Sequence, residues 1–262
     1  MMKAIPQKKI ALIFICVNFP YWPYIGPMIE SCKKNFLTNH KVDYFLWSDI
    51  GDTFPEVTYG ATVFPTEGVN WPLPTLMRYH LFLQQEEKLK EYDYIFYADA
   101  DMLVVDKIGD EILGDGLTAA QHPMYAFRKG LYFPVEPNPD STAFIPVPKY
   151  YFAGGFQGGR AKDFIEAMKV MKRAIDEDFM KNYMARWNDE SHWNRYLFDN
   201  PPAVVLDPGY IYPDDLAIGD YYIPIWGRDY SKKILTITKQ FSLTKEGGKS
   251  FKENIDGLTK LK

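Results

Sequence analysis

The sequence is poor in cysteine, in long apolar runs and in excess charge of one sign, and each shortage excludes a class of protein. Its 262 residues contain two cysteines, Cys16 and Cys32, which are too few for a disulfide scaffold. The longest apolar run, residues 10–17, is less than half as long as a membrane-spanning helix. No small-residue cleavage site of a signal peptide follows that run. We therefore expect a cytoplasmic protein with no membrane anchor.

The charge balance and the apolar content describe an ordinary folded protein. Thirty Lys and Arg residues against 34 Asp and Glu residues leave a net charge of −4, so nucleic acid is not the expected partner. The hydrophobic share of 47% is too high for a disordered chain. With no internal repeat and no low-complexity linker, we expect a single domain over residues 1–250 and a flexible basic tail over residues 251–262.

Strand and helix patterns alternate along the chain. One helix is expected after the first loop, ending at about residue 39, and others over residues 76–92, 161–178 and 189–198. Residues 123–148 are too rich in proline and aromatics for a regular element. This alternation predicts an α/β fold, with a mostly parallel central sheet flanked by helices. The expected strands are residues 9–17, 42–47, 61–64, 94–97, 117–121 and 203–206.

Two aspartates, Asp99 and Asp101, directly follow the apolar run at residues 94–97. On an extended backbone both carboxylates point to the same side and could share one cation. Mg²⁺ or Mn²⁺ would complete its coordination shell with water and the oxygens of a diphosphate. Two solvated loop aspartates produce the same pattern, so the motif alone leaves both interpretations open.

Two further segments carry candidate chemistry. Residues 152–159 hold four glycines, which suit close approach of a ligand to the backbone and equally a tight turn between strand and helix. Asp189 and Glu190 lie at a predicted helix start, where carboxylates act as helix caps or as catalytic groups. His192, beside Trp193, is better interpreted as a hydrogen-bonded structural residue than as a base.

These three segments, in this order and spacing, resemble glycosyltransferase family 6, the family of the histo-blood-group A and B transferases and the α1,3-galactosyltransferases. The resemblance runs from about residue 10 to about residue 239 and is strongest over residues 94–206. It implies a GT-A fold, a UDP-sugar donor held through Mn²⁺, and transfer with retention of configuration to form an α1,3 linkage. Besides the segments above it rests on His122-Pro123, Ala143-Phe144-Ile145-Pro146 and Tyr150-Tyr151.

The resemblance also implies roles for single residues. Asp99 and Asp101 would bind the metal, and Glu190 would act as nucleophile or as stabiliser of an oxocarbenium-like transition state. His122, Trp187 and Asn188 would form the acceptor site. The implied donor-binding residues are Val17, Asn18 and Tyr21 around the uracil, then Arg78, Asp99, Ala153, Gly154, Gly155 and Asp189. Since Ala153 and Gly155 match the positions that select the sugar, two small residues there favour UDP-N-acetylgalactosamine over UDP-galactose.

The sequence also departs from the mammalian members of that family. Asn188 stands where they commonly have histidine, and the surroundings of Glu136 differ, so the acceptor is expected to be a galactoside with or without fucose. Mammalian members have an N-terminal anchor and stem, which makes the anchorless bacterial or viral branch the better match. The tail beyond Ser250 would order as a lid when UDP binds. A UDP-sugar hydrolase and a non-enzymatic carbohydrate-binding protein remain as alternative functions.

Overall fold

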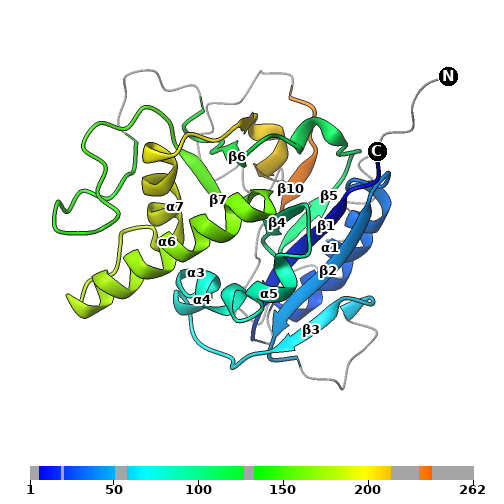
Figure 1. Ribbon diagram of the computed structural model, residues 1–262, viewed down its shortest axis with the longest axis horizontal. Helices are drawn as coiled ribbons and strands as arrows, with labels where there is room; N and C mark the ends of the chain where they lie inside the picture. Colours follow the sequence, from blue (N-terminus) through cyan, green and yellow to red (C-terminus); the bar gives the residue numbers. More distant parts are fainter. Residues whose placement is uncertain (1–5, 19–20, 51–57, 127–132, 214–229, 238–262) are drawn as a thin grey trace, which may run out of the picture.

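A mixed seven-stranded sheet forms the centre of the computed structural model, which describes residues 6–18, 21–50, 58–126, 133–213 and 230–237 (Figure 1). Every neighbouring pair is parallel except the two made by β7, which runs antiparallel to β4 and β6. The predicted α/β class and mostly parallel sheet are confirmed. The strands lie in the order β3 (Thr62–Pro65), β2 (Lys41–Ser48), β1 (Lys9–Cys16), β4 (Tyr94–Ala98), β7 (Phe152–Arg160), β6 (Leu117–Gln121) and β8 (Val204–Leu206).

Helices cover both faces of this sheet, and strand β1 shows why (Figure 1). Its side chains alternate between two buried clusters, so the strand is apolar on both faces, as expected for a central parallel strand. One cluster is shared with α1 (Trp22–Asn35), and the other with α4 (Arg78–Leu83), α6 (Ala161–Met180) and α7 (Asn188–Asp199).

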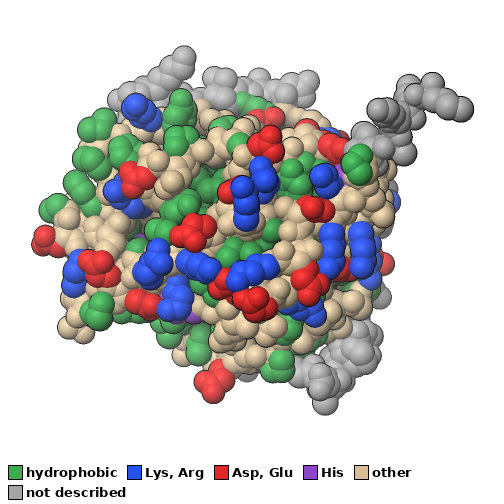
Figure 2. All heavy atoms as spheres, viewed as in Figure 1, with side chains coloured by type: hydrophobic (Ala, Val, Ile, Leu, Met, Phe, Trp, Pro, Cys, Tyr) green, Lys and Arg blue, Asp and Glu red, His purple; other side chains and the backbone are tan. Residues whose placement is uncertain are grey.

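Helix α6 has the amphipathic pattern predicted for residues 161–178. Its buried stripe includes Phe164, Met168, Met171 and Ile175, spaced three and four residues apart as one helix face requires. On its outer side, Lys172 pairs with Asp176 at 2.7 Å and Lys181 with Glu177 at 2.8 Å. Figure 2 shows acidic and basic side chains interspersed across this face of the molecule, as such pairs produce.

The continuous helix predicted over residues 76–92 is wrong. The chain instead forms α3 (Leu73–Leu76), α4 and α5 (Glu86–Leu89), with breaks at Met77 and Gln85, whose backbones leave the α region. Leu76, Tyr79 and Phe82 are spaced by three residues, which drifts away from one face of a regular helix. Breaking the helix keeps all three side chains in the same buried cluster.

Of the two interpretations left open for the glycine-rich segment, the tight turn is wrong, because these residues form strand β7 between β4 and β6. A Cβ atom on Gly158 would lie 2.3 Å from the carbonyl oxygen of Ile95, and one on Gly159 would lie 2.3 Å from that of Gly116. Gly159 also has a φ of +136°, a conformation that side chains disfavour. The glycines therefore allow the neighbouring strands to approach closely.

A second, three-stranded sheet was not predicted. It joins β5 (Met102–Val104), β10 (Ile234–Thr236) and β9 (Tyr212–Pro213), strands too short to give a period-two pattern. Two 3₁₀ turns, Asp110–Ile112 and Pro208–Ile211, complete the regular structure of the described residues. Within those residues, no helix combines the length and the apolar character needed to cross a membrane.

The long connection between β6 and β7 is irregular, as predicted. In its described parts, residues 122–126 and 133–151, the ordered pairing is one isolated bridge between Glu136 and Phe144. The predicted basic tail and its lid, residues 251–262, lie outside the described residues, as does the segment that follows residue 237.

Candidate active site

A pocket opens where β1 and β4 end, at the carboxyl edge where α/β sheets bind ligands. It encloses about 620 Å³, including space open to solvent. Six of the residues that line this pocket were predicted from the sequence to bind the donor or the metal. Trp71 and Thr75 also line it and were not predicted. The six are Val17, Asn18, Tyr21, Arg78, Asp99 and Asp101.

Asn18 is held in the left-handed region at the rim of this pocket, with a φ of +72°. Its backbone nitrogen donates to both carboxylate oxygens of Asp49, at 3.0 and 3.1 Å, and its side-chain nitrogen donates to the carbonyl of Val69 at 2.9 Å. Asp49 also accepts a 2.9 Å hydrogen bond from the indole of Trp22. Asp49 therefore anchors both Asn18 and Trp22, a role that the sequence reasoning missed.

Arg78 is the buried centre of the site, with 3% of its side chain exposed. Its Nη1 lies 3.2 Å from Oδ2 of Asp189 and donates to the carbonyl of Gly154 at 3.0 Å. Its Nη2 lies 3.6 Å from Oδ1 of Asp99, and the guanidinium carbon lies 4.2 Å from the centre of the Tyr97 ring. The guanidinium thus joins residues from β4, β7 and α7.

The Asp-x-Asp pair lines the same pocket. Tyr97 donates a short hydrogen bond to Oδ1 of Asp99, and the backbone nitrogen of Asp99 donates to the carbonyl of Gly155 at 2.9 Å. A Cβ atom on Gly155 would lie 2.7 Å from Oδ2 of Asp99. Glycine at position 155 therefore allows the Asp99 carboxylate to lie against strand β7.

The donor set suits a hard cation that is shared with a ligand. Asp99 and Asp101 both line the pocket, and the side chain of Asp99 is 35% exposed. Across the described residues, no group of three or more His, Cys, Asp and Glu side chains converges as a complete metal site. Two carboxylates leave the other coordination positions to water and ligand oxygens, as is common for Mg²⁺.

Glu190 is fixed against strand β7 by both of its oxygens. The Tyr151 hydroxyl donates to Oε1 at 2.5 Å, and the backbone nitrogen of Gly154 donates to Oε2 at 2.8 Å. Asn194, one turn further along α7, exchanges two hydrogen bonds of 2.8 Å with the backbone of Phe152. Asp189 and Glu190 lie in the first turn of α7, as predicted, but Glu190 is more than a helix cap because its carboxylate bonds to Tyr151 and Gly154.

Asp189 is buried, with 4% of the residue exposed. Burial raises its pKa to about 7, Arg78 opposes that rise, and the nearby charges of Asp99 and Glu190 add to it. Arg78 keeps its charge, because its pKa stays above the ordinary value next to Asp189 and Asp99 despite burial. Arg78 lines the pocket, and Asp189 pairs with it from α7.

Ala153 and the predicted acceptor residues lie around this core. Ala153 is buried in β7. His122 stacks edge-on with Tyr151 and accepts a hydrogen bond at Nδ1 from the backbone of Met124, so the proton of the neutral ring is on Nε2. Burial lowers the pKa of His122, although the charge of Glu190 opposes this.

Trp187 and Asn188 form the start of α7. The Trp187 residue is 45% exposed, and its backbone nitrogen donates to Oγ of Ser191 at 3.0 Å. Asn188 has a φ of +50° and donates its backbone N–H to the carbonyl of Ala185 at 3.0 Å. Asparagine tolerates this left-handed conformation better than most residues.

The sequence reasoning also missed residues that support the site from β4, from β7 and from the residue before β7. Tyr97 orients Asp99, and Tyr151 orients Glu190. Gln157 donates to the Gly154 carbonyl. Burial raises the pKa of Tyr97 and of Tyr151 above the ordinary value, so both hydroxyls stay protonated as donors. The available signal was their position: Tyr97 precedes the Asp-x-Asp pair by two residues, and Tyr151 precedes the glycines.

Comparison with known proteins gives one consistent family. The family described as glycosyltransferase family 6 matches residues 6–222. The chain is 32% identical over 203 residues to human globoside alpha-1,3-N-acetylgalactosaminyltransferase 1, covering 74% of this chain and 58% of that protein. It is 30% identical over 205 residues to histo-blood group ABO system transferase 1 of Rattus norvegicus, covering 75% and 59%.

A bacterial protein is also similar. The O-antigen biosynthesis glycosyltransferase WbnI of Escherichia coli is 26% identical over 208 residues, covering 78% of this chain and 88% of that protein. The chain therefore spans most of the bacterial relative but less than two thirds of the length of the mammalian relatives above.

Proposed function

We propose that this chain, which belongs to glycosyltransferase family 6, transfers a hexose from a UDP-sugar to a galactoside acceptor with retention of configuration, forming an α1,3 linkage. The printed names of two relatives, an alpha-1,3-N-acetylgalactosaminyltransferase and an ABO system transferase, support this reaction class. The mixed sheet with its single antiparallel strand, and a pocket at the ends of β1 and β4, support the GT-A fold.

The observation that carries this proposal is the way Gly154 joins the two charged parts of the site. Its N–H donates to Glu190 and its carbonyl accepts from Arg78, so one residue of β7 fixes a carboxylate and a guanidinium together. A fixed carboxylate stabilises the positive charge of an oxocarbenium-like transition state without reorganising. We assign that role to Glu190, as stabiliser or as nucleophile.

A divalent cation fits the carboxylates that line the pocket. Asp99 and Asp101 would hold Mn²⁺, or Mg²⁺, with the diphosphate oxygens as further ligands. The ion would neutralise charge on the departing UDP as a Lewis acid. Tyr97 and Arg78 orient the Asp99 carboxylate for this contact, and Tyr21, Val17 and Asn18 line the same pocket, where they suit the base.

The favoured donor is UDP-N-acetylgalactosamine. Ala153 and Gly155 are both small residues, and small residues at the two positions that the resemblance assigns to sugar selection favour an acetamido group. Asp189 would contact the donor sugar, although its burial against Arg78 also makes it a support for that side chain. His122, Trp187 and Asn188 would contact the acceptor, lactose-like or fucosylated.

The test is UDP release from UDP-N-acetylgalactosamine and, separately, from UDP-galactose, each with Mn²⁺ or EDTA. Each mixture is run without acceptor, with lactose and with 2′-fucosyllactose, and the trisaccharide or tetrasaccharide product is analysed for its linkage. We expect release that requires the metal, rises with acceptor and is faster with the N-acetylgalactosamine donor.

Two other outcomes would contradict the proposal. Metal-dependent release that no galactoside accelerates would identify a UDP-sugar hydrolase. Saturable sugar binding with no release from either donor would identify a carbohydrate-binding protein.

A further inference from the structure

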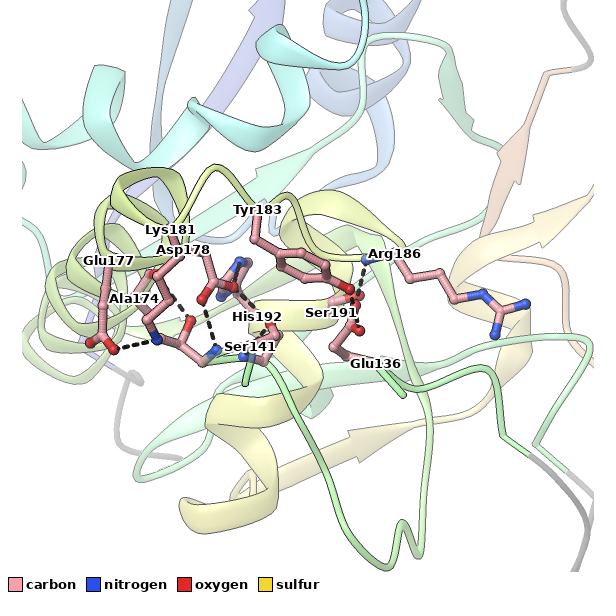
Figure 3. Close-up of polar contacts among 12 residues, drawn as sticks. Glu136, Ser141, Ala174, Glu177, Asp178, Lys181, Tyr183, Arg186, Ser191 and His192 are labelled. Atoms are coloured by element: carbon pink, nitrogen blue, oxygen red, sulfur yellow. Dashed lines mark hydrogen bonds and ion pairs between the residues drawn. The ribbon is translucent and has the colours of Figure 1, made fainter. Parts of the chain in front are cut away.

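Glu136, in the irregular connection before β7, is a carboxylate with no exposed surface. Its Oε1 accepts hydrogen bonds from the backbone of Asn138 at 2.8 Å and from the Tyr183 hydroxyl at 2.6 Å. Its Oε2 accepts one from the backbone of Arg186 at 2.6 Å. Figure 3 shows the Tyr183 hydroxyl and the Arg186 nitrogen converging on this carboxylate, while the Arg186 side chain points away from it. A buried carboxylate is stable only when donors replace its water, and these three do so.

The connection that carries Glu136 is itself fixed to the end of α6. Asp178 accepts from the Ser141 hydroxyl at 2.7 Å and from the backbone of Thr142 at 2.8 Å. The Thr142 hydroxyl donates to the carbonyl of Ala174 at 3.0 Å, and Glu136 itself bridges to Phe144. Residues 136–144 are therefore held against α6 by hydrogen bonds. Through Glu136, the same segment also binds the backbone of Arg186.

The residue after Arg186 is Trp187, the half-exposed ring assigned above to the acceptor. The neighbouring carboxylate Glu190 has its own bonds to Gly154 and Tyr151, and Asn194 ties α7 to β7. The start of α7 is thus held in two ways: from β7 at Glu190 and Asn194, and from the acceptor-side connection at Arg186. Glu136 provides the second of these attachments, because its carboxylate accepts the hydrogen bond from the backbone of Arg186.

We infer that Glu136 is a positioning residue that fixes Arg186, and through it the Trp187 ring, in the place where the acceptor binds. This inference rests on the proposed transferase function only for the identity of the acceptor. Its direct content is that one buried carboxylate holds the segment before α7 against residues 136–144.

The chemistry of a glutamine substitution makes the inference testable with little change of shape. The backbone nitrogens of Asn138 and Arg186 can only donate, and they bond to different oxygens of Glu136. Glutamine has a single side-chain oxygen, and its NH₂ group would face one of these N–H groups as donor against donor. Glu136→Gln must therefore lose one of the two backbone anchors, whichever way the amide turns.

The first experiment compares amide hydrogen exchange in the wild type, Glu136→Gln and the control Glu177→Gln. Glu177 lies near the end of α6, with 54% of its side chain exposed, and pairs with Lys181. We expect exchange at the backbone amide that loses its acceptor, within residues 136–140 or residues 183–188, to be at least about tenfold faster in Glu136→Gln only, with β7 unchanged. Equal exchange in all three proteins would overturn the inference.

The second experiment measures initial rates with the acceptor and the donor varied in turn. Loss of a charged hydrogen bond predicts a roughly 5- to 30-fold higher acceptor KM in Glu136→Gln, with the donor KM and the acceptor-free release of UDP within about twofold of wild type. A general loss of stability would move both substrates together. Parallel changes in both KM values, or none in either, would contradict a role in placing Trp187.

Two further variants keep the outcome decisive. If Glu136→Gln does not fold, Glu136→Asp replaces it. Aspartate keeps the charge, but its shorter side chain spans only one of the two backbone nitrogens. Amide exchange and an acceptor KM that are the same in Glu136→Asp as in the wild type would refute the inference. Tyr183→Phe keeps both backbone anchors and should change the acceptor KM less than about threefold. If the wild type shows no acceptor-dependent release, the transferase proposal fails, and the exchange comparison still decides whether Glu136 holds the segment.

Discussion

Replacing Arg78 with methionine tests the electrostatic core of the site. The guanidinium is buried and pairs with Asp189, whose side chain is 6% exposed, and more loosely with Asp99, whose side chain is 35% exposed. Methionine keeps much of the volume and removes the charge. The Gly154 carbonyl keeps one donor, Nε2 of Gln157 at 2.8 Å, so the main loss falls on Asp189.

At a pH where Asp189 is ionised in the wild type, the expected cost follows from breaking a buried ion pair by removing one partner, which destabilises proteins by about 3–5 kcal/mol. Asp99 adds little, because solvent screens it. For a domain of this size that cost lowers the melting temperature by roughly 6–20 °C. As the matched control, Lys181→Met removes a half-exposed partner of Glu177 and should cost less than about 1 kcal/mol.

The pH dependence gives the sharper test. The pKa of Asp189 is already about 7 because of burial, and loss of Arg78 raises it further. An acid whose folded pKa exceeds its unfolded pKa keeps its proton in the folded state, so stability falls as pH rises towards the folded pKa. Both proteins should lose this stability together up to about pH 7, where Asp189 of the wild type ionises, and only Arg78→Met should go on losing it at higher pH. The stability difference between wild type and Arg78→Met should therefore be roughly constant below about pH 6 and grow from about pH 7 to pH 9, as measured by denaturant unfolding. A difference that is constant with pH, or below about 1 kcal/mol throughout, would refute this account of the pair.

Three other predictions follow from the same contacts. Glu190→Gln should lower acceptor-dependent UDP release at least about 10²-fold at an unchanged melting temperature; near-normal release would exclude a charged role. Asp101→Asn should raise the Mn²⁺ concentration for half-maximal release at least about tenfold, and an unchanged metal titration would exclude Asp101 as a ligand. Burial lowers the pKa of His192 to about 4, so wild-type stability should fall between about pH 6.5 and 4, and His192→Gln should remove up to roughly 3 kcal/mol of that fall. Identical unfolding profiles for the two proteins would contradict a buried neutral imidazole.

The parts of the fold that the sequence predicted are those with a local signature. Strand β1 is apolar from Ile10 to Cys16 because both of its faces are buried there, and α6 repeats its apolar side chains at helical spacing. The Asp99-x-Asp101 pair is recognisable because an apolar strand delivers it to the sheet edge. Each of these signals is complete within about ten to twenty residues.

The parts that it did not predict depend on contacts between distant segments. Glycines at 158 and 159 suggested a turn, but the chain uses them where β4 and β6 approach β7 closely. Arg78 is separated by 76 residues from the Gly154 carbonyl that it binds. Glu136 is 50 residues from Arg186, and nothing in the local sequence indicates that a carboxylate among prolines is fully buried.

The site is built from two supports that meet at the start of α7. Strand β7 holds Glu190 and, through Gly154, Arg78 with the carboxylates beside the pocket. The connection before β7 holds the backbone next to Trp187 through Glu136. Strand β7 thus supports both Asp99, which is assigned to the leaving nucleotide, and Glu190, which is assigned to the developing positive charge. The acceptor side depends instead on an irregular segment that is fixed to α6. If the proposed function holds, sequence changes around Glu136 would alter the choice of acceptor while the hydrogen bonds that orient Glu190 and Arg78 stay in place.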